Sequence, residues 1–219
     1  MKRNYFLVVL IFIVFFVISL LTNIIGPIIP DVIKSFDLNY FMVSFLPFSF
    51  FIAYLISIPA GMLIEKYREK SVMAAAFLLA GIGALFFALV PFFSVVIISL
   101  FLIGFGMAML QVAINPLLRT AGGEVHFAFN SVFAQLFFGS ASFLSPQLYS
   151  FLVKNLESGN INDNIILLSL SKLVPESLPW VSLYWIFALL SFLMSIVILV
   201  IKLPKVELKE DERTGAWET

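Results

Sequence analysis

Long stretches without a charged side chain dominate the chain. The longest covers residues 71–118, between Lys70 and Arg119, and contains 48 residues. At about 1.5 Å per residue, a helix of that length is twice the ~30 Å of hydrocarbon in a bilayer. The pattern therefore predicts two membrane-spanning helices joined by a tight turn, and Pro91 lies where we expect that turn.

Further charge-free blocks extend this pattern to the whole chain. The apolar run after Met1-Lys2-Arg3 is longer than the hydrophobic region of a secretory signal, so it counts as a helix. The predicted fold class is an all-α membrane protein with a bundle of six transmembrane helices over residues 1–202. A charged tail follows over 203–219. The expected helices cover about residues 5–27, 40–64, 72–90, 94–118, 127–153 and 180–201.

The basic residues are distributed unevenly between the two ends of these helices. If the amino terminus is cytoplasmic, ten of the 13 basic residues lie on cytoplasmic segments and three, Lys34, Lys154 and Lys172, lie outside. This excess follows the positive-inside rule. We expect a multi-pass protein of the cell (inner) membrane with both termini in the cytoplasm and a short outer loop at residues 31–37.

Composition excludes several function classes. The net charge is zero, so nothing points to a nucleic-acid partner, and the absence of cysteine excludes disulfides and thiolate chemistry. The sequence holds no HExxH or GxSxG motif and no paired carboxylates within the apolar blocks. We therefore expect no enzyme and no cofactor.

Small residues and one short apolar patch predict local features. Gly81, Gly83, Gly104, Gly106 and the run 139–142 are typical of closely packed membrane helices. The polar stretch 154–179 contains Ile165-Ile166-Leu167-Leu168, which we expect to form a short helix on the membrane surface.

Five amide side chains within the predicted spans are the candidate ligand contacts. Polar groups in membrane helices usually face the bundle interior or a watery cavity. Amides both donate and accept hydrogen bonds, which suits a small neutral sugar, although they could equally bond one another across helices. Asn115-Pro116 also places a broken backbone there, which favours a cavity. The candidates are Asn23, Gln111, Asn115, Asn130 and Gln135.

The segment between the second and third spans carries a charged motif. Gly61, Glu65, Lys66, Arg68 and Lys70 place a glycine, then an acid, then a basic run. This order resembles the loop signature of the major facilitator superfamily. It departs from that signature in having Glu65 for aspartate and Arg68 for the second glycine.

Two longer stretches resemble the fucose/glucose/galactose permease branch of that superfamily. They are residues 21–70 and 104–146, with Leu110-Gln111-Val112-Ala113-Ile114-Asn115-Pro116 as the most diagnostic part. The resemblance covers most of residues 5–202 and implies the amino-terminal half of a twelve-helix transporter. It also implies hexose import by alternating access, coupled to H+ or Na+.

The resemblance bears on individual residues as well. Proton-coupled members carry acids at the places of Gly26 and Gln111, which cannot hold a proton, so the coupling ion stays open. Asn130 matches a family asparagine, whereas Gln135 lies near a family amide but not on it. We expect a fragment that lacks its carboxy-terminal six-helix half. The alternative is a partner-dependent or non-transporting membrane subunit if 219 residues is the true length.

Overall fold

The computed structural model describes residues 4–161, 164–204 and 206, and these residues form helices and connecting segments without a strand. The predicted all-α class is therefore confirmed. The α-helices are α1 (Tyr5–Thr22), α2 (Ile25–Phe36), α3 (Tyr40–Ile52), α4 (Ser57–Leu89), α5 (Phe93–Gly122), α6 (Phe127–Glu157), α7 (Ile165–Leu173) and α8 (Ser182–Val200). Short 3-10 turns, η1 (Ala53–Ile56), η2 (Glu124–His126) and η3 (Pro179–Val181), lie between them.

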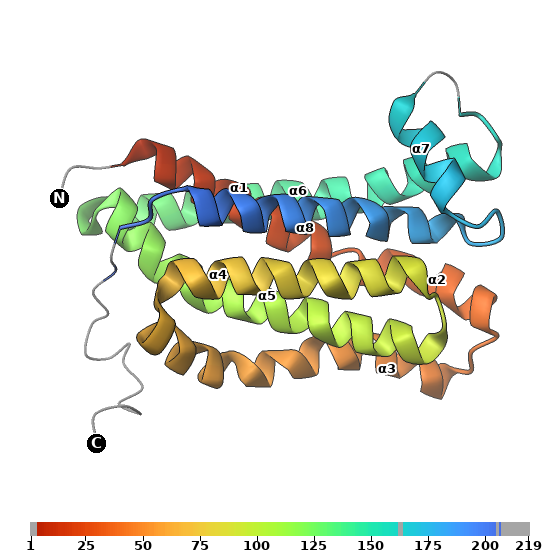
Figure 1. Ribbon diagram of the computed structural model, residues 1–219, viewed down its shortest axis with the longest axis horizontal. Helices are drawn as coiled ribbons and strands as arrows, with labels where there is room; N and C mark the ends of the chain where they lie inside the picture. Colours follow the sequence, from red (N-terminus) through yellow and green to blue (C-terminus); the bar gives the residue numbers. More distant parts are fainter. Residues whose placement is uncertain (1–3, 162–163, 205, 207–219) are drawn as a thin grey trace.

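The long helices run back and forth along one axis (Figure 1). The start of α1 and the end of α8 lie at one end, which we call the inner end. The opposite end, which holds α7, is the outer end. Arg68 has non-helical dihedral angles inside α4 and separates the second crossing from the third. Pro91 lies in the short link between α4 and α5, where the sequence predicted a turn.

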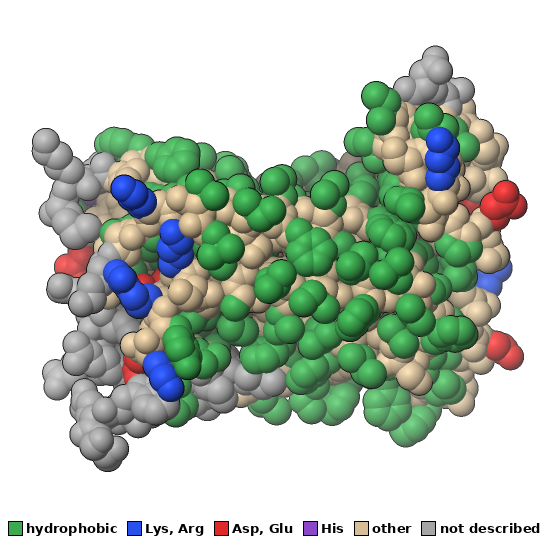
Figure 2. Space-filling view, in the orientation of Figure 1, with side chains coloured by type: hydrophobic (Ala, Val, Ile, Leu, Met, Phe, Trp, Pro, Cys, Tyr) green, Lys and Arg blue, Asp and Glu red, His purple; other side chains and the backbone are tan. Residues whose placement is uncertain are grey.

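The length and composition of the helices match a bilayer. Five segments are long and apolar enough to cross one, and a sixth, Tyr40–Leu55, is shorter. Figure 2 shows a broad apolar belt with charged side chains gathered toward its two ends. Together these features make an all-α membrane bundle.

The first predicted helix, residues 5–27, differs from the observed structure. The chain breaks at Asn23 and then continues as α2, so Asp31 and Lys34 lie on a helix and not in an outer loop. Pro27 is tolerated because it lies in the first turn of α2, where backbone N–H groups have no helical acceptor. The predicted second helix, residues 40–64, is divided among α3, η1 and the start of α4, and the predicted third helix, residues 72–90, forms the later part of α4. The ranges predicted for the remaining helices match α5, α6 and α8 with ends displaced by a few residues. Residues 207–219 of the predicted tail lie outside the described part.

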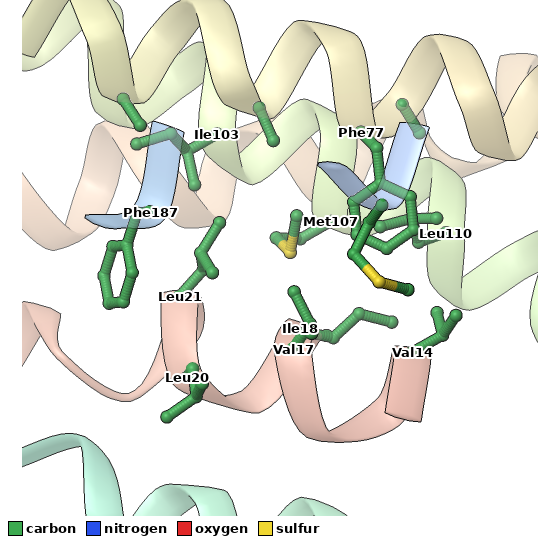
Figure 3. Packing of buried hydrophobic residues seen from close by; sticks show 14 of the residues in the cluster. Val14, Val17, Ile18, Leu20, Leu21, Phe77, Ile103, Met107, Leu110 and Phe187 are labelled. Atoms are coloured by element: carbon green, nitrogen blue, oxygen red, sulfur yellow. The ribbon is translucent and has the colours of Figure 1, made fainter. Parts of the chain in front are cut away.

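The core is apolar and is shared by four helices. Figure 3 shows Ile18 and Leu21 of α1 directed toward Met107 of α5, with Phe77 of α4 and Phe187 of α8 beside them. These side chains are almost fully buried. Side-chain packing therefore holds the helices together, as membrane bundles require.

Two glycines of α5 allow the closest helix contacts. A Cβ atom on Gly104 would collide with the backbone oxygen of Phe50 in α3, and one on Gly106 would lie 2.5 Å from the backbone oxygen of Ala76 in α4. These positions confirm the close packing predicted from small residues. Gly139 differs, because nothing lies within 4 Å of the place where its Cβ would be.

Candidate functional site

A cavity of about 190 Å³ lies where α1, α5 and α6 meet. Three of the five predicted amides, Gln111, Asn115 and Gln135, line it. Their neighbours are apolar, so the wall combines carboxamides with aromatic and aliphatic surface. The lining residues are Phe15, Ile18, Gln111, Ile114, Asn115, Gln135 and Phe138.

Helix geometry explains how the two amides of α5 share this wall. Gln111 and Asn115 are four residues apart and so project from the same face. The Asn115 Nδ2 group donates a hydrogen bond to the Gln111 backbone oxygen at 3.3 Å. Asn115 and Gln135 are exposed, whereas Gln111 is half-buried. Two of the three carboxamides are therefore accessible to a ligand.

Tyr54 orients the half-buried amide, and the sequence reasoning missed it. The Gln111 Nε2 group donates a hydrogen bond to the Tyr54 hydroxyl at 3.0 Å. A tyrosine in the middle of an apolar span usually needs such a partner, which is the signal that could have identified it.

The other two predicted amides lie outside the lining of this cavity. Asn23 Nδ2 donates to the backbone oxygen and the hydroxyl of Ser19, at 3.1 and 3.0 Å. The Nδ2 atom of Asn130 lies against Gly122, near the end of α5. Counted along their helices, Asn23 is five residues outward of Ile18 and Asn130 five inward of Gln135, about 7.5 Å in each case. They flank the cavity at opposite ends.

The charged motif between the second and third crossings lies at the inner end. Arg68 has φ 69° and ψ 154°, a conformation that favours glycine, and this is the place where the family signature has its second glycine. The Lys66 Nζ atom lies 5.2 Å from the centre of the Tyr67 ring. Glu69 is buried beside Arg68 and interacts with its charge. The motif thus forms the break that joins two crossings.

At the outer end, polar contacts hold α2 to its neighbours. The buried Tyr149 hydroxyl of α6 donates a hydrogen bond to the Asp31 carboxylate. The Trp180 Nε1 group donates to the Ser35 hydroxyl at 2.9 Å. Asp31 and Ser35 are four residues apart and share one face of α2.

Sequence comparison identifies transporters as relatives. A putative glucose/galactose transporter of Helicobacter pylori is 30% identical over 207 residues, 91% of this chain and 49% of the relative. A glucose/galactose transporter of Brucella abortus is 28% identical over 157 residues, 69% of this chain and 38% of the relative. The L-fucose-proton symporter of Escherichia coli is 28% identical over 127 residues, 56% of this chain and 29% of that protein. The chain spans at most about half the length of these relatives.

A solved structure with a similar fold and a matching family model agree with these sequence relatives. The crystal structure of a major facilitator transporter, FucP, in the outward conformation matches with a TM-score of 0.69 at 23% identity. This match covers 91% of this chain and 50% of that one. The family model described as Major Facilitator Superfamily matches residues 11–218. The chain therefore belongs to the major facilitator superfamily, as its loop motif and the stretches 21–70 and 104–146 indicated.

Proposed function

We propose that this chain provides one six-helix half of a secondary transporter that moves a small neutral hexose by alternating access. The observation that carries the proposal is the cavity, where three carboxamides and two phenylalanine rings converge. None of the described residues that line it is charged. Carboxamides donate to and accept from hydroxyl groups, and apolar surface with a few convergent polar groups is typical of a small-molecule site.

The proposed roles follow from the contacts of each side chain. Gln111, oriented by Tyr54, together with Asn115 and Gln135 would bond the sugar hydroxyls. Phe15 and Phe138 would contact the C–H face of the ring. Asn23 and Asn130, which flank the cavity, stay predictions as further ligand contacts.

Coupling to a cation is the second part of the proposal. One relative is named a proton symporter and two others carry the names of hexose transporters, which supports a sugar and a coupling ion here as well. The positions that resemble the family's acids hold Gly26 and Gln111. Uptake measured with an imposed H+ gradient and, separately, with a Na+ gradient would identify the ion.

Sugar uptake by variants tests the site. In a protein that contains this chain and a second half, Gln111→Ala, Asn115→Ala and Gln135→Ala should each lower galactose, glucose or fucose uptake at low substrate concentration. A lost hydrogen bond of about 1–2 kcal/mol corresponds to a loss of about 5- to 30-fold. Gln147→Ala is the matched control, because Gln147 is exposed on α6 and does not line the cavity. Unchanged uptake by all three site variants would contradict the sugar site.

Orientation in the membrane is a further part of the proposal. Lys66, Arg68, Lys70 and Arg119 lie at the inner end, and we propose that this end faces the cytoplasm of a cell (inner) membrane. Because the chain has no cysteine, single cysteines report accessibility without background. An impermeant maleimide should label Ser158→Cys in intact cells, and Lys66→Cys only after permeabilisation. The reverse labelling pattern would contradict this orientation.

A further inference from the structure

A second cavity, of about 360 Å³, lies at the inner end, away from the candidate sugar site. Residues 68–71, at the break in α4, and residues 202–204, after α8, form its wall. Because α4 and α8 pack along each other, the start of the third crossing and the end of the last one meet here (Figure 1). Val200 ends the last apolar span, and Lys202 lies two residues beyond it. The cavity is therefore at the level of the lipid headgroups.

Basic side chains dominate the wall of this cavity. Arg68, Lys70 and Lys202 are positive and Glu69 is negative, so three positive charges and one negative leave a net charge of +2. Glu69 is only 5% exposed and interacts with the charge of Arg68. No ion pair joins Lys70 or Lys202 to another residue in the described part of the chain. These two lysines are thus available to an anion.

The backbone adds to the positive potential of the cavity. The non-helical Arg68 interrupts α4, so a new helical run begins at Glu69 on the cavity wall. The N-terminal end of a helix carries a partial positive charge and favours anions. The exposed Ser71 hydroxyl is a further hydrogen-bond donor in this first turn. Lysines beside a helix N-terminus are typical of sites that bind phosphate.

Apolar surface leads away from the cavity into the membrane. On α4, the exposed Ala75 and Leu78 follow Ser71 at intervals of four and three residues and therefore lie along one line. On α8, Ile196 and Leu199 are 58% and 57% exposed. Figure 2 shows the basic side chains of the inner end beside this apolar surface. The ligand that fits both features has an anionic group joined to an apolar chain.

Other occupants match only part of this arrangement. A free phosphate ion matches the charge of the cavity and leaves the apolar surface beside it uncovered. Residues 205–213 of the tail contain four acidic and three basic side chains, so this segment would bring positive charges to a positive cavity. An anionic phospholipid matches both the charge and the apolar surface.

We propose that this cavity binds the phosphate group of an anionic phospholipid, with Lys70 and Lys202 in contact with the phosphate and an acyl chain along α4 and α8. Basic cavities between membrane helices bind lipid headgroups of this kind. The bound lipid would hold the start of the third crossing against the end of α8. The site does not depend on the proposed sugar site.

Lipid binding by the full chain in detergent tests the proposal. Native mass spectrometry at increasing phosphatidylglycerol or phosphatidylcholine measures the affinity for each lipid, and phosphatidylglycerol should bind more tightly. The double variant Lys70→Gln, Lys202→Gln should bind phosphatidylglycerol about 10- to 30-fold more weakly, since each basic residue near a membrane surface contributes about 5-fold. The double variant Lys34→Gln, Lys172→Gln is the matched control, because it removes two exposed lysines at the outer end. It should bind phosphatidylglycerol as the parent chain does.

Three results would overturn the proposal. Equal weakening in the two double variants would show that net charge alone explains the binding. Equal affinity of the parent chain for the two lipids would show that no anionic group is selected. Displacement of phosphatidylglycerol by an equal concentration of inorganic phosphate would identify a soluble anion, and not a lipid, as the ligand.

A single variant keeps the test independent of the folding of the double variant. Lys202 is exposed and lies beyond the end of α8, so Lys202→Gln leaves the helix packing intact. It should weaken phosphatidylglycerol binding about 5-fold, whereas Lys172→Gln should not. Unchanged binding by Lys202→Gln would overturn the proposed contact.

Discussion

Arg68 has φ 69° and ψ 154°, which side chains other than glycine adopt at a cost of about 1–3 kcal/mol. Arg68→Gly should therefore raise the free energy of unfolding in detergent by about 1 kcal/mol, since the variant loses the charge interaction with Glu69 but relieves the strain. Lys66→Gly, at an exposed helical position of the same segment, is the control and should lower it by about 1 kcal/mol. Thermal unfolding of both variants measures this, and a lower Tm for Arg68→Gly than for Lys66→Gly would contradict the prediction.

Gly104 and Gly139 should respond in opposite ways to the same substitution. Gly104→Ala places a methyl group against the Phe50 backbone and should destabilise the bundle by about 1–3 kcal/mol. Gly139→Ala meets open space on a helix and should be neutral or stabilising by up to about 1 kcal/mol. Thermal unfolding in detergent compares them. Equal effects would mean that close helix contact does not explain Gly104.

The sequence predicted the amides of the cavity better than their partners. Gln111 and Asn115 stand out because polar side chains are rare in the apolar blocks and these two share a helix face. Tyr54 was missed because its hydrogen bond to Gln111 joins residues 57 positions apart, and no local pattern reveals such a pair. Asn23 was predicted as a ligand contact from its residue type alone. The positions of residues in the sequence did not predict its hydrogen bonds to Ser19 either.

At the scale of elements, α2 depends on contacts with two other segments. Tyr149→Phe removes the hydrogen bond to Asp31 and leaves the contact between Trp180 and Ser35. A hydrogen bond to a charged group contributes about 1.5–3 kcal/mol. Amide hydrogen exchange in Ile25–Phe36 should therefore become about 10- to 100-fold faster. Tyr40→Phe is the control, because Tyr40 is 92% exposed. Unchanged exchange in Tyr149→Phe would show that other contacts hold α2.

The six crossings were predictable, whereas α2 was not. Charge-free blocks such as 71–118 follow directly from the cost of placing charge in hydrocarbon, so the number of spans is encoded locally. The sequence predicted a helix over about residues 5–27 and then a short outer loop at 31–37, whereas the chain forms a separate helix, α2, from Ile25 to Phe36. Tyr149 of α6 and Trp180 of η3, which are distant in the sequence, form hydrogen bonds with α2 and stabilise it as a helix. Local sequence preference alone does not predict this helix.

At the scale of the whole molecule, the candidate cavity has the character of one wall of a site. Its volume of about 190 Å³ is below the about 300–1,000 Å³ of typical ligand pockets, and two of its three amides are exposed. The relatives are about twice as long as this chain or longer, and transporters of this architecture alternate between two halves. The function proposed above therefore requires a second half with six further apolar spans to form the opposite wall.

Transport by reconstituted protein tests this expectation. The 219-residue chain alone should give no galactose counterflow in proteoliposomes, because a single wall cannot close around a substrate on either side of the membrane. The chain joined to the second half should give counterflow, and Gln111→Ala in that longer protein should reduce it, whereas Gln147→Ala should not. Counterflow by the 219-residue chain alone would contradict this prediction, since copies of this bundle would then enclose the path by themselves.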